Sequence, residues 1–253
     1  MSESYRSKLM TKKKSGTLWE TVKTVVYAVL IAFVIRTVAY EPFNIPSGSM
    51  IPTLLIGDYL FVSKFSYGYS RYSLPLGLPL LSGRIFFTSP KRGDVVVFKL
   101  PRDPKIDYIK RVIGLPGDRI QVVRGVLHIN GQPVKLERTQ DYVANEDGFE
   151  TRVPQLIETL PGGVQHPILK LTDEGPLNNT GEYVVPPDEY FMMGDNRDNS
   201  LDSRTTQVGY VPAENLVGRA QFLFFSTDGN ASIWEVWKWP LAIRYGRLLE
   251  AIH

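Results

Sequence analysis

Two serines separated by a single glycine lie in a proline-rich stretch near the start of the chain. Ser47, Gly48 and Ser49 fall within residues 42–52, where three prolines fix an extended, non-helical backbone. Gly48 permits a tight turn that exposes a hydroxyl and aims a backbone N–H at the same point. A nucleophile for acyl transfer and its oxyanion hole require both. A plain linker of serine, glycine and proline is the alternative, and it is the stronger interpretation of this segment taken alone.

A lysine stands in the middle of an apolar stretch further along the chain. In residues 106–113, a period of two places Lys110 on one face with Ile106, Tyr108 and Val112. Loss of water disfavours the ammonium and lowers the pKa of the lysine, which can then act as a general base. An edge-strand lysine that reaches solvent is the alternative, and it is the stronger one for this residue alone. Together with a serine that has no usable histidine, however, the lysine indicates a Ser–Lys pair, a known variant of the catalytic triad.

The composition and the motifs exclude several other kinds of site. The 253 residues include no cysteine, so disulfides, thiol nucleophiles and cysteine-bound metals are ruled out. The chain has no H-E-x-x-H, no G-x-S-x-G and no P-loop. Residues 195–202 are acidic but lack the glycine and the glutamate that an EF-hand calcium loop needs. We therefore expect no metal and no cofactor.

The first forty residues predict a membrane anchor. Residues 1–16 carry five basic residues against one glutamate, a net charge of +4, and since the whole chain has +3, the remainder sums to −1 and offers no basic face to a nucleic acid. Residues 22–40 are mostly apolar and as a helix would span about 28 Å. The basic residues upstream favour a cytoplasmic tail at 1–16, a transmembrane helix at 17–40 and an extracytoplasmic domain at 41–253. A cleaved signal peptide and a buried core helix are the alternatives.

The rest of the chain predicts a mainly β fold. Short apolar runs bounded by turn residues indicate strands at 59–64, 95–100, 106–113, 120–123, 126–129 and 190–193. Pro116-Gly117 and Asn130-Gly131 are turn signals. Residues 138–182 are polar, and we interpret them as a loop-rich extension. Residues 231–253 form a tryptophan-rich amphipathic segment, with a short helix expected at 242–252.

Five blocks of sequence, in this order, resemble those of bacterial type I signal peptidases, the membrane-anchored Ser–Lys endopeptidases that remove signal peptides from exported proteins. The blocks are residues 40–54, 57–62, 91–98, 107–118 and 194–204. The resemblance implies an antiparallel β-sheet catalytic core, with a smaller β-rich extension inserted at about 120–187. It also implies a single-pass protein of the bacterial cytoplasmic membrane whose partners are the lipid bilayer and the signal peptides of exported preproteins. We expect a monomer.

The resemblance also implies roles for individual residues. Ser49 is the nucleophile, Lys110 the general base, and Ser47 supplies a hydroxyl to the oxyanion hole beside the backbone N–H of Ser49. Ser200 orients the lysine amine. Four charged residues stabilise the surroundings of the lysine: Arg111, Asp195, Asp202 and Arg204. Seven apolar residues match positions that line the pockets for the substrate's −1 and −3 side chains, with ordinary core packing as the alternative: Phe43, Ile45, Met50, Leu54, Val97, Tyr108 and Ile109.

Two other functions stay open on the sequence alone. One is a related Ser–Lys processing peptidase with a single dedicated substrate. The other is a catalytically silent, membrane-tethered β-domain that binds exported chains. The proposed Ser–Lys pair argues against a silent domain, because a buried lysine is costly without a use.

Overall fold

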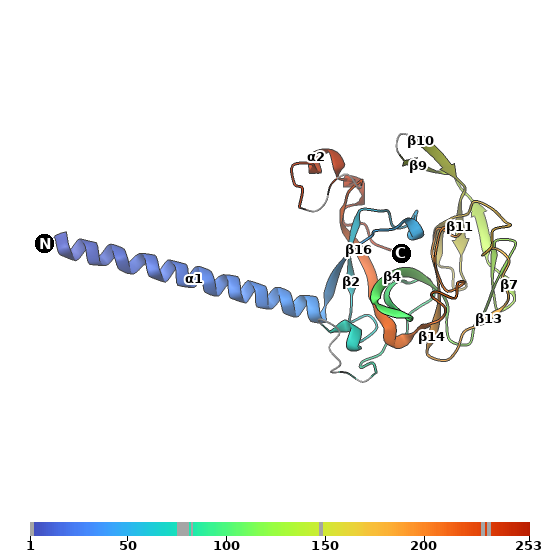
Figure 1. The fold of residues 1–253 in the computed structure, drawn as a ribbon, viewed down its shortest axis with the longest axis horizontal. Helices are drawn as coiled ribbons and strands as arrows, with labels where there is room; N and C mark the ends of the chain where they lie inside the picture. Colours follow the sequence, from blue (N-terminus) through green and yellow to red (C-terminus); the bar gives the residue numbers. More distant parts are fainter. Residues whose placement is uncertain (1–2, 75–80, 82, 147–148, 229–230, 232–233) are drawn as a thin grey trace.

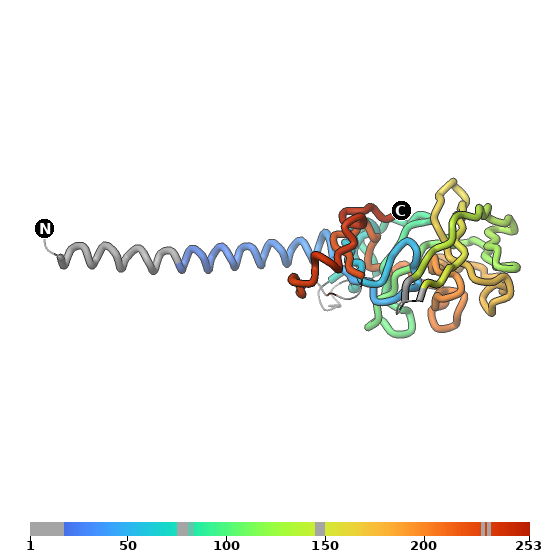
Figure 2. Tube along the Cα trace, turned by 90° about the horizontal axis from the view of Figure 1, so that it is seen from above, coloured from blue at the N-terminus to red at the C-terminus, as the bar shows by residue number. Residues whose placement is uncertain are grey.

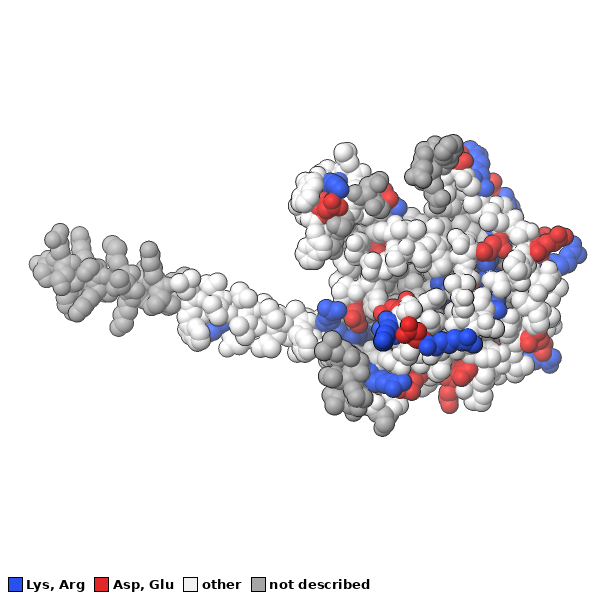
Figure 3. Space-filling model, in the orientation of Figure 1, with Lys and Arg blue, Asp and Glu red and all other residues white. Residues whose placement is uncertain are grey.

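A long N-terminal helix projects from a β-rich domain (Figures 1 and 2). The computed structural model describes residues 3–74, 81, 83–146, 149–228, 231 and 234–253. Helix α1 (Glu3–Val38) begins well before the predicted residue 17 and ends two residues before the predicted residue 40. Its part Leu18–Val38 has a mean hydropathy of 1.8 and is long and apolar enough to cross a membrane, and none of it is buried. The alternative of a buried core helix is therefore wrong, and Figure 3 shows this part of the helix as mostly uncharged.

The domain is built on a seven-stranded antiparallel sheet, as the resemblance implies. Its strands lie in the order β1-β2-β16-β3-β4-β14-β15. In that order they are β1 (Tyr40–Asn44), β2 (Asp58–Ser63), β16 (Leu216–Ser226), β3 (Val95–Leu100), β4 (Asp103–Gly114), β14 (Glu189–Met193) and β15 (Val211–Pro212). Val95 and Val97 of β3 pack into one buried cluster, whereas Val96 and Phe98 pack into another. The centre of the sheet is thus covered on both faces at β3. Strand β4 pairs with β3 at this centre.

The extension between β4 and β14 consists of three smaller sheets. The first, in the order β13-β5-β6-β7, contains β13 (Tyr183–Val184), β5 (Arg119–Val123), β6 (Val126–Ile129) and β7 (Gln132–Pro133). The second, in the order β12-β11-β8, contains β12 (Gln165–Leu169), β11 (Gln155–Thr159) and β8 (Lys135–Arg138). The third is the hairpin of β9 (Tyr142–Glu146) and β10 (Phe149–Val153). The turn predicted at Asn130-Gly131 is confirmed, since both residues have positive φ, 53° and 78°, between β6 and β7.

The prediction of a loop-rich segment at 138–182 is wrong. Four strands, β9 to β12, lie within it. The alternation of β11 and β12 is hidden in the sequence because two of their buried positions are polar, Glu158 and His166. Burial of a charge becomes visible only when its partner is known.

The helix predicted at 242–252 is also wrong. Only the short helix α2 (Trp239–Ala242) and the 3₁₀ turn η5 (Tyr245–Arg247) form there. The backbone instead bonds to strand β16: Leu249 N–H donates to Leu223 O at 2.8 Å, and Leu223 N–H donates to Glu250 O at 2.9 Å. Pairing with an existing strand therefore overrides the helical pattern of a short segment.

Candidate active site

Ser49 lies in a tight 3₁₀ turn, η1 (Gly48–Met50), that follows strand β1. The turn is anchored to the core, because the side chains of Ile45, which precedes it, and of Met50, its last residue, are buried in one hydrophobic cluster. Ser47 precedes the turn with an extended backbone (φ −134°, ψ 153°) and is exposed. The backbone N–H groups at the start of such a turn have no partner within the turn. The Ser47 side chain makes no capping hydrogen bond to the turn, and Ser47 and Ser49 line the same cleft.

Lys110 reaches the serine from strand β4. Its Nζ lies 2.5 Å from Ser49 Oγ and donates to Ile109 O at 2.9 Å. Lys110 is 3% exposed, and its Nζ lies 5.3 Å from the centre of the Tyr108 ring, as expected from the period of two. Burial lowers the pKa of Lys110 to about 8, because desolvation outweighs the attraction of Asp202 and Asp195. The amine can therefore lose its proton near neutral pH.

The charged residues around the lysine form two buried ion pairs. Arg111 donates to Asp195 through Nε at 2.9 Å and through Nη2 at 2.8 Å. Arg204 Nη2 lies 2.8 Å from Asp202 Oδ2. Burial raises the pKa of Asp195, but the charge of Arg111 lowers it further, so that the carboxylate stays ionised. Both aspartates are paired with guanidinium groups, and their role as a charged scaffold around the lysine stays a prediction.

The segment between β14 and Asp202 holds the serine turn in place. The backbone N–H of Asn196 donates to Ser49 O at 3.1 Å, and its side-chain amide donates to Gly48 O at 3.1 Å. A side chain at Gly194 would overlap Ser200 Oγ and would lie 2.5 Å from Ser49 O. Only glycine fits there, so this segment can approach the serine closely.

Ser200 lies beside Gly194 within this closely packed segment. It is 6% exposed, and its Oγ makes no hydrogen bond to any of the residues that the structure describes. A buried hydroxyl without a partner calls for an explanation. Its assignment as the hydroxyl that orients the lysine amine stays a prediction.

A cleft of about 530 Å³ opens over Ser49 and Lys110. Five of the seven predicted pocket residues line it: Phe43, Ile45, Val97, Tyr108 and Ile109. The other two, Met50 and Leu54, are fully buried in the core cluster that contains Ile45 and Val97.

Sequence reasoning missed several other residues that line the same cleft: Asn44, Pro46, Asp107, Asn199 and Leu201. Leu201 is 49% exposed. Its place directly after Ser200 is the signal in the sequence that could have identified it. Thr53 was also missed, although its hydroxyl donates to Asp195 at 2.5 Å, since nothing in the sequence pairs residues so far apart.

Comparison with known proteins supplies the class. The family model described as signal peptidase, peptidase S26, matches residues 18–225. Signal peptidase I of Rickettsia typhi is 44% identical over 225 residues, which cover 85% of this chain and 83% of that protein. Signal peptidase I of Rickettsia conorii is 46% identical over 211 residues, which cover 79% and 77%. A crystal structure of a signal peptidase I from Enterococcus faecalis V583 is 25% identical, with a TM-score of 0.31, and the match covers 52% of this chain and 97% of that one.

The family model and the Rickettsia relatives make the mainly β chain, with its N-terminal apolar helix, a peptidase. More particularly, the chain belongs to the signal peptidase family, peptidase S26. Signal peptidases act on preproteins that carry signal peptides, and an apolar N-terminal helix fits the membrane anchoring of such an enzyme.

Proposed function

We propose that the chain is a serine endopeptidase that removes N-terminal signal peptides from exported preproteins, cutting after small residues at −1 and −3 through a Ser–Lys dyad. One observation carries the proposal: the 2.5 Å contact between Ser49 Oγ and the buried amine of Lys110, at the base of an open cleft. A nucleophile and a base within hydrogen-bond distance are the signature of covalent catalysis.

In this mechanism the neutral amine of Lys110 takes the proton of Ser49 as Oγ attacks the carbonyl carbon of the −1 residue. The oxyanion of the tetrahedral intermediate accepts hydrogen bonds from the Ser49 N–H and the Ser47 hydroxyl. Breakdown of the intermediate expels the amine of the +1 residue, which takes the proton from Lys110, and leaves an acyl-enzyme. Water, deprotonated by the amine of Lys110, then attacks the ester, and the bond to Ser49 Oγ breaks as Lys110 returns the proton to that oxygen. Ser200 orients the amine through both steps.

The edges of the cleft suit an extended substrate. Strand β14 pairs with β4 only between Arg111 and Gly114, so the part of β4 at residues 107–110 is not paired with β14. Residues 43–47 line the other side of the cleft. A peptide strand can add between these two segments, with its backbone bonded to the protein and alternate side chains directed into pockets. Pockets lined by Ile45, Val97 and Ile109 favour small apolar side chains over large ones.

Membrane attachment of the proposed enzyme is supported by two exposed apolar features. Residues 18–38 of α1 contact little of the domain. The basic tail upstream supports a cytoplasmic N-terminus and a domain on the outer side of the bacterial cytoplasmic membrane. Trp234 and Trp237 are 83% and 72% exposed, and Figure 1 shows α2, which follows them, on the side of the domain from which α1 leaves. Tryptophan favours the membrane–water interface.

Cleavage of a purified preprotein by the full chain in detergent tests the function. The wild type should release the mature protein, and Ser49→Ala should release none. Ser89→Ala, an exposed serine outside the cleft, is the matched control and should cleave normally. Cleavage by a folded Ser49→Ala variant would refute the assigned nucleophile.

A panel of unrelated preproteins separates this function from a peptidase with one dedicated substrate. The proposed enzyme should process most members of the panel, because its recognition depends on an extended backbone and two small side chains. Processing of a single member would favour the dedicated enzyme.

A further inference from the structure

The segment of residues 194–197 has two sides, and only one of them faces the catalytic serine. On that side Asn196 binds the carbonyl groups of Gly48 and Ser49. On the other side the segment pairs with strand β12 of the extension: Leu169 N–H donates to Asp195 O at 2.9 Å, and Arg197 N–H donates to Leu169 O at 2.9 Å. The extension therefore supports the segment that holds the serine turn.

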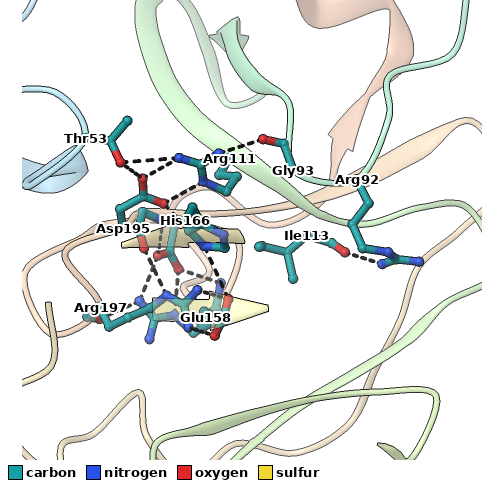
Figure 4. A network of polar contacts seen from close by, with 12 residues as sticks. Thr53, Arg92, Gly93, Arg111, Ile113, Glu158, His166, Asp195 and Arg197 are labelled. Atoms are coloured by element: carbon teal, nitrogen blue, oxygen red, sulfur yellow. Dashed lines mark hydrogen bonds and ion pairs between the residues drawn. The ribbon is translucent and has the colours of Figure 1, made fainter. Parts of the chain in front are cut away.

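A buried ion pair fastens the same contact. Arg197 donates to Glu158 of strand β11 through Nη1 at 2.7 Å and through Nη2 at 2.5 Å, and both side chains are buried (Figure 4). Its Nε donates to Gly194 O at 3.2 Å. Two parallel N–H donors on one carboxylate fix the orientation of the arginine side chain as well as its distance. The position of Gly194, which contacts Ser200 and the serine carbonyl, is thus tied to a carboxylate on the extension.

The charges in this cluster are balanced. Burial raises the pKa of Glu158, but Arg197 lowers it to about 2, so that the pair is ionised at neutral pH. His166 Nε2 lies 3.4 Å from Glu158 Oε2 and 3.8 Å from Asp195 Oδ1, and burial lowers the pKa of this histidine, which is then neutral. Arg111 pairs with Asp195, so that Arg197, Glu158, His166, Asp195 and Arg111 form one row of contacts (Figure 4). A carboxylate removed from such a row leaves Arg197 as a buried charge without its main partner.

We propose that Glu158 is a positioning residue for the nucleophile: through Arg197 and residues 194–197, the extension holds Ser49 at the distance from Lys110 that catalysis needs. The proposal rests on the function proposed above, because it takes Ser49 as the nucleophile. It gives the inserted extension a part in catalysis, although β11 and β12 contribute no residue to the cleft lining.

Glu158→Gln in the full chain tests the proposal, since glutamine keeps the shape and one acceptor but loses the charge. With a short soluble peptide, kcat should fall at least tenfold while KM stays within about twofold, because a nucleophile displaced by about 1 Å loses rate rather than binding. The acid limb of kcat/KM should also move to lower pH. Arg197, once unpaired, competes for Asp195 and adds positive potential near Lys110, whose ammonium is then less stable. A purely structural role would not move this limb.

Asp118→Asn is the matched control. Asp118 forms another ion pair between core and extension, 2.9 Å from Arg92, and its side-chain hydrogen bonds among the described residues go to Arg92, Leu115 and Asn130, not to residues 194–197. This variant should lose a similar part of its thermal stability and keep the wild-type kcat and pH profile. Equal losses of kcat in both variants would overturn the proposal and leave the extension a general support of the fold.

Glu158→Asp replaces Glu158→Gln as the test variant if the glutamine variant does not fold. Aspartate keeps the charge but withdraws the carboxylate by one methylene, so kcat should fall at unchanged KM while the acid limb stays in place. A wild-type kcat in a folded variant at position 158 overturns the proposal. Ser49→Ala is assayed in parallel to keep the two failures apart. Residual cleavage there would refute the nucleophile, and with it the role of Glu158, whereas a wild-type kcat at position 158 beside an inactive Ser49→Ala variant refutes the role of Glu158 alone.

Discussion

Lys110 Nζ and Ser49 Oγ lie 2.5 Å apart, although 61 residues separate them in the chain. The two groups meet because β4 and the turn after β1 are fixed independently, one by the sheet and the other by the buried side chains beneath the turn. Each group supplies what the other lacks, since the hydroxyl needs a base and the amine needs a proton to take. We therefore expect them to act as a unit.

Ser49→Ala and Lys110→Met should each abolish cleavage, and the double variant should be no worse than either one. Residues that act as a unit have strongly non-additive effects on kcat. Lys110→Arg should be equally inactive, because a guanidinium does not lose its proton in a protein. Initial rates on one preprotein, with the exposed Lys135→Met as the control, measure this. An active Lys110→Arg enzyme would rule out the general base.

The rate should depend on pH through the same amine. Catalysis needs neutral Lys110, whose pKa is lowered to about 8 by burial, so kcat/KM should rise with pH and level off above about 8. The attraction of Asp202 opposes this shift. Asp202→Asn should therefore move the acid limb to lower pH, as long as the variant folds. A limb near 10.5, the ordinary value for lysine, would contradict the burial of the amine.

The strands that carry the dyad could be predicted because their residues are apolar and bounded by turns. Residues 95–100 match β3 at both ends, and residues 106–113 fall within β4. The period of two also placed Lys110 with Tyr108 and directed Arg111 to the opposite face, where it meets Asp195. The local sequence pattern is sufficient to predict a strand where its side chains alternate between two environments.

The extension and the support behind the serine could not be predicted in this way. Glu158 and His166 occupy buried strand positions that the sequence marks as polar, and Arg197 finds its partner 39 residues upstream. The contact of Asn196 with Gly48 joins residues 148 positions apart. Such pairs depend on how one sheet packs against another. The periodicity of a single strand carries no information about that packing.

Ser47→Ala should lower kcat by roughly 10²–10³ and leave KM nearly unchanged, as for the loss of one donor from an oxyanion hole. The side chain lies at the rim of the cleft and is exposed, so the fold should not suffer. Ser47→Thr should keep part of the rate because it keeps the hydroxyl. Steady-state assays on a soluble peptide separate the two constants. Wild-type kcat in Ser47→Ala would make Ser47 a turn residue only.

Asp195→Ala should destabilise the domain by about 3–5 kcal/mol, because it leaves Arg111 as a buried charge without its carboxylate. The exposed pair of Arg152 and Glu150 offers the contrast, and Glu150→Ala should cost less than about 1 kcal/mol. Urea unfolding of residues 38–253, which lack the exposed helix, measures both. Equal effects would show that burial does not decide the contribution of these ion pairs.

Residues 18–38 contact little of the domain, but Tyr69 donates to Val38 O at 2.6 Å, so the cut belongs before Val38. The fragment 38–253 should fold and cleave a soluble peptide with a kcat comparable to that of the full chain. It should process a membrane-embedded preprotein more slowly, because the tether supplies effective concentration at the surface.

The same fragment should still bind lipid vesicles through its exposed tryptophans. Trp234→Ala and Trp237→Ala should each reduce co-sedimentation with vesicles without affecting the thermal midpoint, since both side chains are largely exposed. Trp239 differs, because its ring lies 4.9 Å from that of Phe225 and is half-buried. Trp239→Ala should therefore lower the thermal midpoint. Unchanged vesicle binding by folded Trp234→Ala and Trp237→Ala variants would show that the bilayer is held by α1 alone.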